Sequence, residues 1–340
     1  MATALFLTAA LMNTTQAVAA GKLTFYCSVQ NEVCEKMAQQ FGEKYDVETK
    51  FVRNGTGATL AKLKAEKDNP QADIWYGGTI EPHFQAGDLG LLEPYRSPAQ
   101  KDILPQFHSL TAEKGDLTSI VYMMVLGFGV NTEKLKQLGV EMPKKWTDLL
   151  NPALKGQIQL PDPRTSGTTY TVIATLIELW GEEKAFDYLR NLDASVSQYV
   201  KSGLVTSNLS RGESAVSIGF VHSYETEKEK GAPVESILPE DGIGYALGAA
   251  SIIKGARNPD NAKLFMDWVL SKEAQEIPWR EYNLYQIPTN IHAEVSPKSV
   301  KVAGLKLVEL DYKRFGSSEE GKRLVDKWVA DIKLQEKAAQ

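Results

Sequence analysis

The sequence predicts an α/β fold built as two lobes, and three observations lead to this prediction. Short apolar segments typical of strands alternate with amphipathic segments typical of helices, a pattern that indicates parallel sheets covered by helices. Long apolar segments at 119–130 and 244–255 suit strands that cross between two lobes. The 340 residues also exceed the length at which a single core keeps growing, which favours two domains.

The elements follow in two cycles. The first reads as a strand KLTFY, a helix over about 30–44, a strand VETKFVR, a helix over about 57–67 and a strand ADIWYGG. The second begins after Asn131 and contains the helix that follows DPRTSGTT, the strand ASVSQYV, a helix near 205–211 and the strand SAVSIGFV. Because the two crossing segments bracket the second cycle, we expect two sheets. Lobe I should comprise 21–122 and 250–295, and lobe II should comprise 123–249 and 296–340.

Composition narrows the possible partners. The net charge is −5, and lysine and arginine form no basic stripe along the chain. A nucleic-acid partner is therefore not expected, because it would need cations clustered over its phosphates. The charged run at 225–231 mixes both signs and reads as a solvated helix end.

The first twenty residues predict export. They contain no charge and end in small residues, with Val18 and Ala20 at the −3 and −1 positions of a possible cleavage site. A basic region is missing before them, so we expect 1–20 to be the remnant of a signal peptide whose true start lies upstream. A buried first helix is the alternative. On the export interpretation the mature chain starts near Gly21 and functions in the periplasm.

Export changes how the two cysteines, Cys27 and Cys34, are read. The pair offers neither four zinc ligands nor the spacing of a redox motif. In an oxidising compartment we expect one disulfide that ties the first strand to the first helix, with two buried thiols as the alternative.

Five loops of small or hydroxyl-bearing residues mark a candidate anion site: 27–31, 53–59, 76–79, 162–169 and 201–206. At one helix start such residues are capping groups, and Thr165 or Ser166 could cap the helix after DPRTSGTT. Several such loops in two lobes favour a cleft, because strand ends that lead into helix starts are where open α/β sheets bind ligands. The predicted ligand-binding residues are Ser28, Thr56, Gly57, Thr79, Ser166, Gly167, Thr168, Lys201, Ser202, Gly203 and His222.

No motif indicates catalysis. GTGATL at 55–60 has Leu60 in place of the third glycine of a dinucleotide fingerprint. A nucleophile elbow, a P-loop and a zinc-protease motif are all missing from the sequence, and the histidines have no metal-ligand spacing. We therefore predict no catalytic residue, no metal and no cofactor.

Several segments together resemble a known family. They are ADIWYGGTIEPH, DPRTSGTTYTVIATLIELWGEEKAFDYLRNL, QYVKSG, RGESAVSIGFVHS and GAASIIKGARNPDNAKLFMDWVLSKEAQ. The chain is similar to the periplasmic substrate-binding proteins of ABC transporters, in the branch labelled ferric-iron-binding that includes sugar-phosphate binders. The resemblance implies a two-lobed type II flytrap that closes on a ligand and delivers it to a membrane permease or a membrane-bound sensor.

The resemblance also bears on the ligand. Iron-binding members use adjacent tyrosines, whereas Tyr199, Tyr224 and Tyr245 are isolated here. Relatives that bind sugar phosphates share the loops at Thr56-Gly57, Ser166–Thr168 and Lys201–Gly203. Those relatives have an aspartate and a glutamate where this chain has Ser223 and Ala246, which argues against a hexose phosphate.

We therefore expect a monomeric, non-catalytic protein that binds a small phosphorylated or phosphonate anion. Ferric-ion transport is the alternative within the family. An exported enzyme acting on phosphate esters is the alternative outside it.

Overall fold

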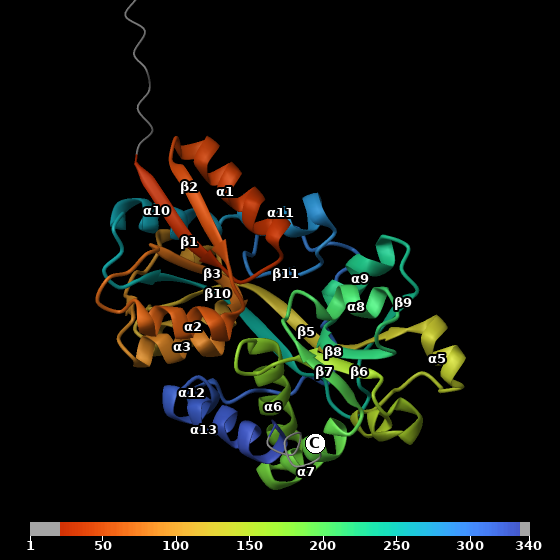
Figure 1. The fold of residues 1–340 in the computed structure, drawn as a ribbon. Helices are drawn as coiled ribbons and strands as arrows, with labels where there is room; N and C mark the ends of the chain where they lie inside the picture. Colours follow the sequence, from red (N-terminus) through yellow and green to blue (C-terminus); the bar gives the residue numbers. More distant parts are fainter. Residues whose placement is uncertain (1–20, 334–340) are drawn as a thin grey trace, which may run out of the picture.

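A computed structural model describes residues 21–333, so the predicted signal segment 1–20 lies outside the described residues. The strands form one hydrogen-bonded path (Figure 1). Its order is β2 (Glu48–Arg53), β1 (Lys22–Cys27), β3 (Ile74–Thr79), β10 (Tyr245–Ile253), β5 (Ser119–Asn131), β8 (Val216–Phe220), β6 (Ile158–Pro161) and β7 (Val196–Val200). Shorter strands pair beside this path: β4 (Leu92–Glu93) on β10, and β9 (Val234–Ile237) and β11 (Ile287–Pro288) on β5.

Strand β5 joins the two halves of the molecule. Its first part, Ser119–Val125, pairs antiparallel with β10, and its second part, Leu126–Val130, pairs antiparallel with β8. Both predicted crossing segments are therefore strands. The two sheets expected from the sequence are linked through β5 into one path, because a single strand of 13 residues is long enough to pair in both halves.

The strands outside the crossover are parallel, as the alternation of strands and helices predicts. Strand β1 pairs parallel with β2 and β3, and β6 pairs parallel with β7 and β8. Cys27 at the end of β1 lies opposite Arg53 at the end of β2 and Tyr76 in β3. Parallel strands in this register place their carboxyl ends, and the loops that follow them, at one edge of the sheet.

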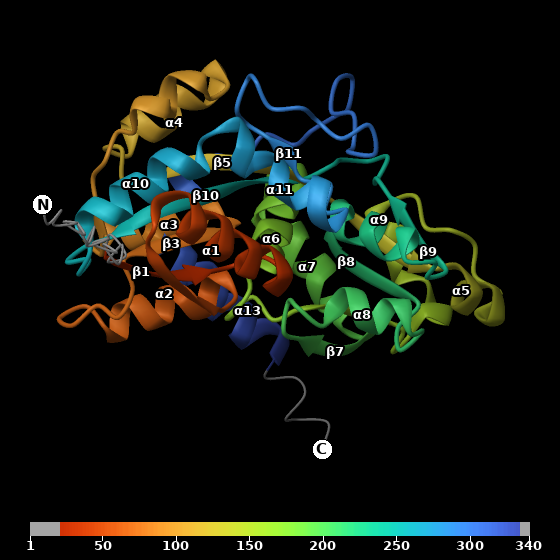
Figure 2. The ribbon, with the colours of Figure 1, turned by 90° about the horizontal axis from the view of Figure 1, so that it is seen from above.

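Helices cover the sheet. The α-helices are α1 (Asn31–Tyr45), α2 (Thr56–Ala65), α3 (Ile80–Asp88), α4 (His108–Glu113), α5 (Thr132–Leu138), α6 (Gly167–Trp180), α7 (Glu182–Asp193), α8 (Val205–Ser210), α9 (Val221–Glu229), α10 (Pro259–Val269), α11 (Lys272–Tyr282), α12 (Tyr312–Phe315) and α13 (Ser318–Trp328). The 3₁₀ turns are η1 (Pro98–Asp102), η2 (Pro105–Phe107), η3 (Trp146–Leu150) and η4 (Pro152–Leu154), and η5 (Val329–Lys333) is a π turn. Figure 2 shows α1, α2 and α10 around one half of the sheet and α8 and α9 beside the other.

The last helices, α12 and α13, pack against elements from both halves. The Tyr170 hydroxyl of α6 donates a hydrogen bond to the Phe315 carbonyl at 2.7 Å. Leu324 and Trp328 of α13 share one buried cluster with Ile80 and Phe84 of α3 and with α6. Figure 1 shows α13 below α3 and beside α6. The C-terminal segment therefore braces the half formed by β1–β3 against the half formed by β6–β8.

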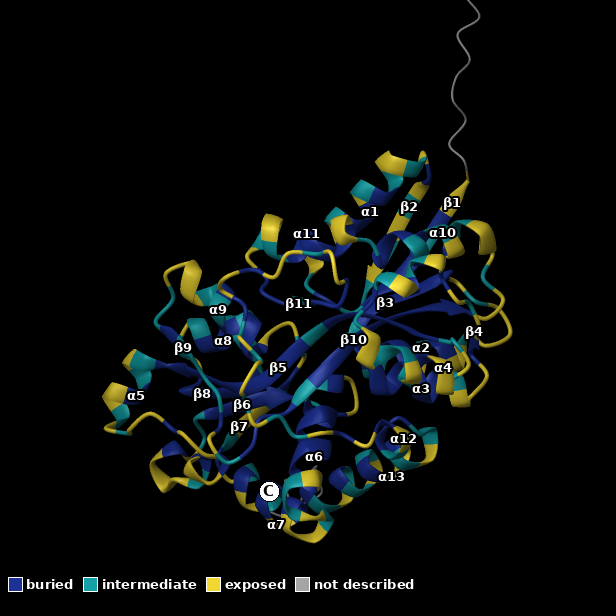
Figure 3. Ribbon diagram, turned by 180° about the vertical axis from the view of Figure 1, so that it is seen from behind, coloured by how far each residue is buried: buried dark blue, intermediate teal, exposed yellow. Residues whose placement is uncertain are grey.

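Burial follows the amphipathic patterns of the sequence (Figure 3). Helix α1 buries the predicted face, Val33, Cys34, Met37, Ala38 and Phe41. Cys27 and Cys34 form the predicted disulfide, with their Cα atoms 6.0 Å apart. Between residues 21 and 333, no helix combines the length and apolar character needed to cross a membrane.

Candidate functional site: loops that meet between the two lobes

Three hydroxyl groups from the first lobe lie at the carboxyl edge of its strands. Ser28 follows β1, Thr56 begins α2 after β2, and Thr79 ends β3. Two glycines in β3 let these loops come together, because Gly77 and Gly78 have φ angles of +82° and +85°. A Cβ atom at Gly78 would lie 1.9 Å from the Thr56 Cγ2 atom. The first lobe therefore presents a compact group of hydroxyls that no other residue at position 78 would allow.

Helix α6 brings the second lobe to this group. Ser166 caps the helix, because its Oγ atom accepts a hydrogen bond from the Thr168 amide at 3.2 Å. The capping role expected at Thr165 or Ser166 is thus confirmed for Ser166. The next amide, that of Gly167, donates to the Thr56 hydroxyl across the lobes at 2.8 Å. The positive end of the α6 dipole therefore points at the hydroxyls of the first lobe.

The absence of side chains at two glycines makes this approach possible. A Cβ atom at Gly167 would lie 2.1 Å from the Thr79 Oγ1 atom and 2.5 Å from the Thr56 Oγ1 atom. A Cβ atom at Gly57 would lie 2.8 Å from the Arg164 carbonyl oxygen. At Gly57 and Gly167 the bare backbone of one loop therefore packs directly against the facing loop. The sequence had predicted both glycines only as ligand-binding residues.

The loop after β7 approaches from the same side. The Ser202 Oγ atom lies 3.3 Å from where a Cβ atom of Gly55 would stand, so this loop also reaches the start of α2. Lys201 is exposed, and its ammonium group forms no ion pair with any described residue. The loop thus adds a hydroxyl, a backbone surface at Gly203 and a solvated positive charge near the other loops.

Arg53 is a cation that the sequence analysis missed. Its Nε atom donates to the Val29 carbonyl at 3.0 Å, and its guanidinium nitrogens lie 3.5 and 3.6 Å from a Cβ position at Gly203. Burial lowers its pKa, an effect that nearby Glu32 partly offsets, and the guanidinium stays charged. Within the described part of the chain, Arg53 forms no ion pair with a carboxylate. Its position at the end of a strand, opposite Cys27, was the signal that could have identified it.

His222 lies in the first turn of α9. Strand β8 ends at Phe220, two residues before it. Its ring stacks on Phe220 with centroids 6.1 Å apart, and its Nδ1 atom has no partner among the described residues. Burial lowers the pKa of His222 to about 3, so the ring is neutral. The adjacent Ser223 accepts a hydrogen bond from Gln30 of the first lobe at 3.2 Å.

A buried carboxyl lies behind the loops. Glu81 in α3 is fully buried, and its Oε1 atom accepts a hydrogen bond from Thr171 of α6 at 3.4 Å. Its Oε2 atom and the Thr79 hydroxyl have no hydrogen-bond partner within the described residues. Burial raises the pKa of Glu81 to about 7. A carboxyl that burial keeps protonated below about pH 7 therefore connects α3 with the helix that begins at Gly167.

The three tyrosines considered for iron do not form a site. Tyr199 donates to Asp193 at 2.6 Å, and Tyr245 packs against the ring of Tyr312. Tyr224 of α9 is buried and accepts a hydrogen bond from Ser217. Burial raises the pKa of Tyr224 well above its usual value. Over residues 21–333, no three histidine, cysteine or acidic side chains gather as metal ligands.

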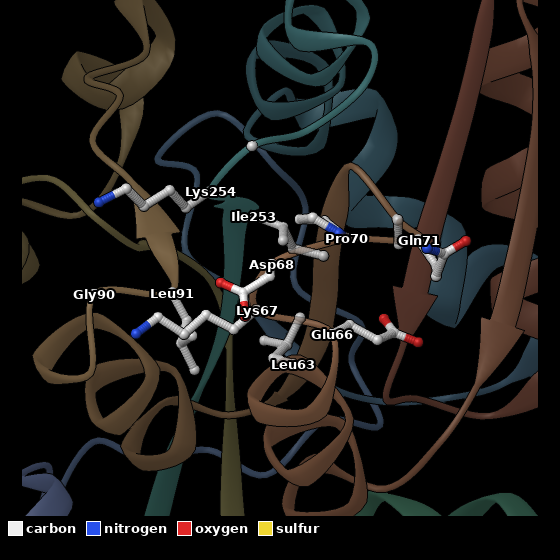
Figure 4. Close-up of a pocket in the computed structure, with 12 residues that line it drawn as sticks. Leu63, Glu66, Lys67, Asp68, Pro70, Gln71, Gly90, Leu91, Ile253 and Lys254 are labelled. Carbon is white, nitrogen blue, oxygen red and sulfur yellow. The ribbon is translucent and has the colours of Figure 1, made fainter.

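A cavity lies elsewhere, in the first lobe. It has a volume of about 350 Å³ and lies beside the end of β10 and the loop after α2. Figure 4 shows Leu63, Leu91 and Ile253 in its wall, with Lys67 and Lys254 beside it. None of the predicted ligand-binding residues lines this cavity. The convergence of the loops, and not this cavity, defines the candidate site.

A two-lobed α/β fold with loops from both lobes meeting at helix starts is the architecture of a solute-binding protein. The chain belongs to the family of bacterial extracellular solute-binding proteins, whose model matches residues 69–314. The resemblance read from the sequence is thereby confirmed.

Relatives of known structure support the same assignment. The chain is 68% identical to the periplasmic binding protein P5PA, with a TM-score of 0.91 over 92% of this chain and 99% of that one. It is 55% identical to AfuA from Actinobacillus pleuropneumoniae, solved with fructose-6-phosphate bound, with a TM-score of 0.90 over 93% and 99% of the two chains. A putative 2-aminoethylphosphonate-binding periplasmic protein of Salmonella typhimurium is 27% identical over 70% of each chain.

Proposed function

We propose that this protein is the periplasmic binding component of an ABC importer and that it binds a small phosphorylated or phosphonate anion between its lobes. One observation carries the proposal. Donor groups of both lobes meet at the starts of α2 and α6, where the Gly167 amide and the Thr56 hydroxyl are 2.8 Å apart. Such a meeting point suits oxygen atoms that carry negative charge.

The charges around this point agree with an anion. Arg53 and Lys201 are both positive, and neither forms an ion pair with a described residue. A phosphate or phosphonate group would give the desolvated guanidinium of Arg53 the negatively charged partner that it lacks among residues 21–333, and a charge-assisted hydrogen bond is stronger than a neutral one. Ser28, Thr79, Thr168, Ser202 and Gly203 complete the proposed set of donors.

Two relatives have names that point to the same chemical group. AfuA holds a phosphate ester and the Salmonella protein is named for a phosphonate. The organic part of the ligand differs here in our proposal, because Ser223 binds Gln30 and Ala246 is buried within β10. Neither residue supplies the carboxylate that would accept hydrogen bonds from sugar hydroxyls.

Transport, and not catalysis, is the role we infer. The residues at the site are hydroxyls, amides and two cations, and the one histidine beside them, His222, has no hydrogen-bond partner at Nδ1 within the described chain. An activated nucleophile would need a base held against it. We propose that the monomer passes its ligand to a membrane permease or to a membrane-bound sensor.

Native mass spectrometry of the untreated protein tests this function first. We expect an added mass that corresponds to an organic anion with a phosphate or phosphonate group. Calorimetry with fructose 6-phosphate, 2-aminoethylphosphonate, inorganic phosphate and Fe³⁺ then ranks the alternatives. Stoichiometric Fe³⁺ binding that survives a competing chelator, together with no binding of any phosphorus-containing probe, would contradict the proposal.

A further inference from the structure

A buried tryptophan lies directly behind Ser28. Trp75 in β3 is fully buried, and its indole Nε1 atom donates a hydrogen bond to the Ser28 Oγ atom at 3.0 Å. The two residues are close because β1 and β3 pair in parallel, with Tyr26 opposite Trp75. Trp75 therefore contacts the candidate site directly through the hydroxyl of Ser28.

The direction of this bond fixes what Ser28 can do. An indole N–H is a donor only, so the Ser28 oxygen must be the acceptor. The Ser28 proton is then left to find another acceptor. The acceptor found among residues 21–333 is Thr59 Oγ1 at 3.4 Å, which is longer than the usual O–H···O distance of about 2.7–2.8 Å. Ser28 thus has a proton to donate to an oxygen of a bound anion.

Trp75 is itself held in place by His83. The two rings stack with their centroids 3.7 Å apart and an angle of 16° between them. The Nε2 atom of His83 lies 3.2 Å from the Gly77 carbonyl, which can only accept, so Nε2 carries the proton. The Nδ1 atom then accepts from Ser251 at 2.9 Å. The indole is therefore fixed by a histidine that also holds the backbone at Gly77.

We propose that Trp75 is a positioning residue for the anion site: its N–H group fills one of the two lone pairs of the Ser28 oxygen and holds the hydroxyl so that its proton is donated to the anion. The inference rests on the proposed function, because it assumes an anion at Ser28. Thr56 shows the same arrangement, since it accepts from the Gly167 amide and keeps its own proton. Two hydroxyls held in this way favour an anion whose oxygens only accept.

A double-mutant cycle tests the inference. Trp75→Phe keeps an aromatic ring for the stack and removes the N–H group. With inorganic phosphate and 2-aminoethylphosphonate as probes, we expect Trp75→Phe to weaken binding roughly three- to tenfold and Ser28→Ala roughly tenfold or more. In the Ser28→Ala background, Trp75→Phe should change the dissociation constant by less than about twofold, because its effect passes through Ser28. If the double variant instead shows the product of the two single effects on the dissociation constant, the two residues act independently and the inference is wrong.

Trp268→Phe is the matched control. Trp268 is also buried in the first lobe, and its indole N–H has no hydrogen-bond partner in the described chain. We expect this variant to bind both probes as the wild type does. An equal loss in Trp268→Phe would show that any indole lost from this lobe disturbs binding, and would contradict a specific role for Trp75.

NMR of the ligand-free protein gives a second readout that does not depend on the Trp75→Phe variant folding. The Trp75 indole proton should shift upfield in Ser28→Ala, because it loses its acceptor. An unchanged indole spectrum would overturn the inference. If the wild type binds neither probe, the proposed function fails and this inference fails with it. If the wild type binds the probes but the two substitutions act independently in the double variant, only this inference is rejected.

Discussion

The Gly167 amide donates a hydrogen bond to the Thr56 hydroxyl at 2.8 Å, and the two residues belong to different halves of the molecule. A Cβ atom at Gly167 would lie 2.1 Å from the Thr79 oxygen and 2.5 Å from the Thr56 oxygen. The closed arrangement of the lobes therefore depends on a hydrogen atom in place of a side chain at position 167. This relationship leads to the first prediction.

Gly167→Ala should abolish tight binding while leaving the protein folded. The added methyl group keeps α6 from approaching Thr56 and Thr79, so the lobes cannot close on a ligand. We expect the dissociation constant for 2-aminoethylphosphonate to rise by more than about a hundredfold in calorimetry, equivalent to over about 2.7 kcal/mol. Gly87→Ala is the control, because position 87 lies in α3 outside the candidate site and its Cβ atom would meet only the side chains of Leu117, at 3.0 Å, and Leu92, at 4.0 Å. Equal affinities in Gly167→Ala and the wild type would show that the lobes close differently.

Arg53→Gln should weaken binding of every phosphorus-containing probe about ten- to a hundredfold, because a desolvated guanidinium loses its interaction with a negative oxygen. Arg96→Gln serves as the control. Arg96 is mostly exposed and lies 3.7 Å from Asp116, away from the loops of the candidate site. Calorimetry at two salt concentrations should show a smaller salt dependence for Arg53→Gln than for the control. If Arg53→Gln binds the probes as tightly as the wild type does, Arg53 does not contact the anion.

The sequence predicted the fold well because its strongest patterns are local. The alternation of strands and helices predicted the parallel pairing, and the apolar segments at 119–130 and 244–255 predicted strands β5 and β10. The single strand path was not foreseen, since pairing of β5 with both halves depends on register. The lobe boundaries near 122, 249 and 295 stay a prediction.

The candidate site was only partly accessible from the sequence. Loops with glycines and hydroxyls at helix starts identified Ser28, Thr56 and Ser166, because such loops have a recognisable composition. Arg53 and Trp75 escaped notice, since a lone arginine or tryptophan in a strand has no pattern. Their roles come from which strands lie side by side, and this is decided by the tertiary fold.

Glu81→Gln should stabilise the protein at alkaline pH. The folded pKa of about 7 is above the usual carboxyl value of 4.5, so between these pH values the folded state holds a proton that the unfolded state has lost. The unfolding free energy of the wild type should therefore fall as the pH rises from about 4.5 through 7.

The difference between Glu81→Gln and the wild type should grow by about 2–3 kcal/mol between pH 5 and pH 8 in urea unfolding. His83 and His222 also titrate, with pKa values that burial lowers to about 3, but both remain in the two proteins and cancel in the comparison. A constant difference would show that Glu81 is ionised in the folded protein.

The Cys27–Cys34 disulfide should be present in the exported protein and should stabilise the start of the site. Mass spectrometry of unfolded, unreduced protein treated with an alkylating agent should show no added alkyl group. Reduction should lower the unfolding free energy by about 2–3 kcal/mol, because the bond closes a short loop of sequence separation 7. Uptake of two alkyl groups without reductant would contradict the disulfide.

The central claim is that loops of both lobes hold one charged group shared by different ligands. The most direct measurement is calorimetry of Thr168→Ala and Lys201→Ala against inorganic phosphate and 2-aminoethylphosphonate, with melting temperature as the folding control. Thr168 lies beyond the Ser166 cap, and Lys201 is exposed, so neither change should disturb folding. Our account predicts that each variant binds both probes about ten- to a hundredfold more weakly, by a similar factor for the two, because the loops contact the shared anion. Unchanged affinity in both well-folded variants would contradict it and would leave Ser166 as a helix cap only.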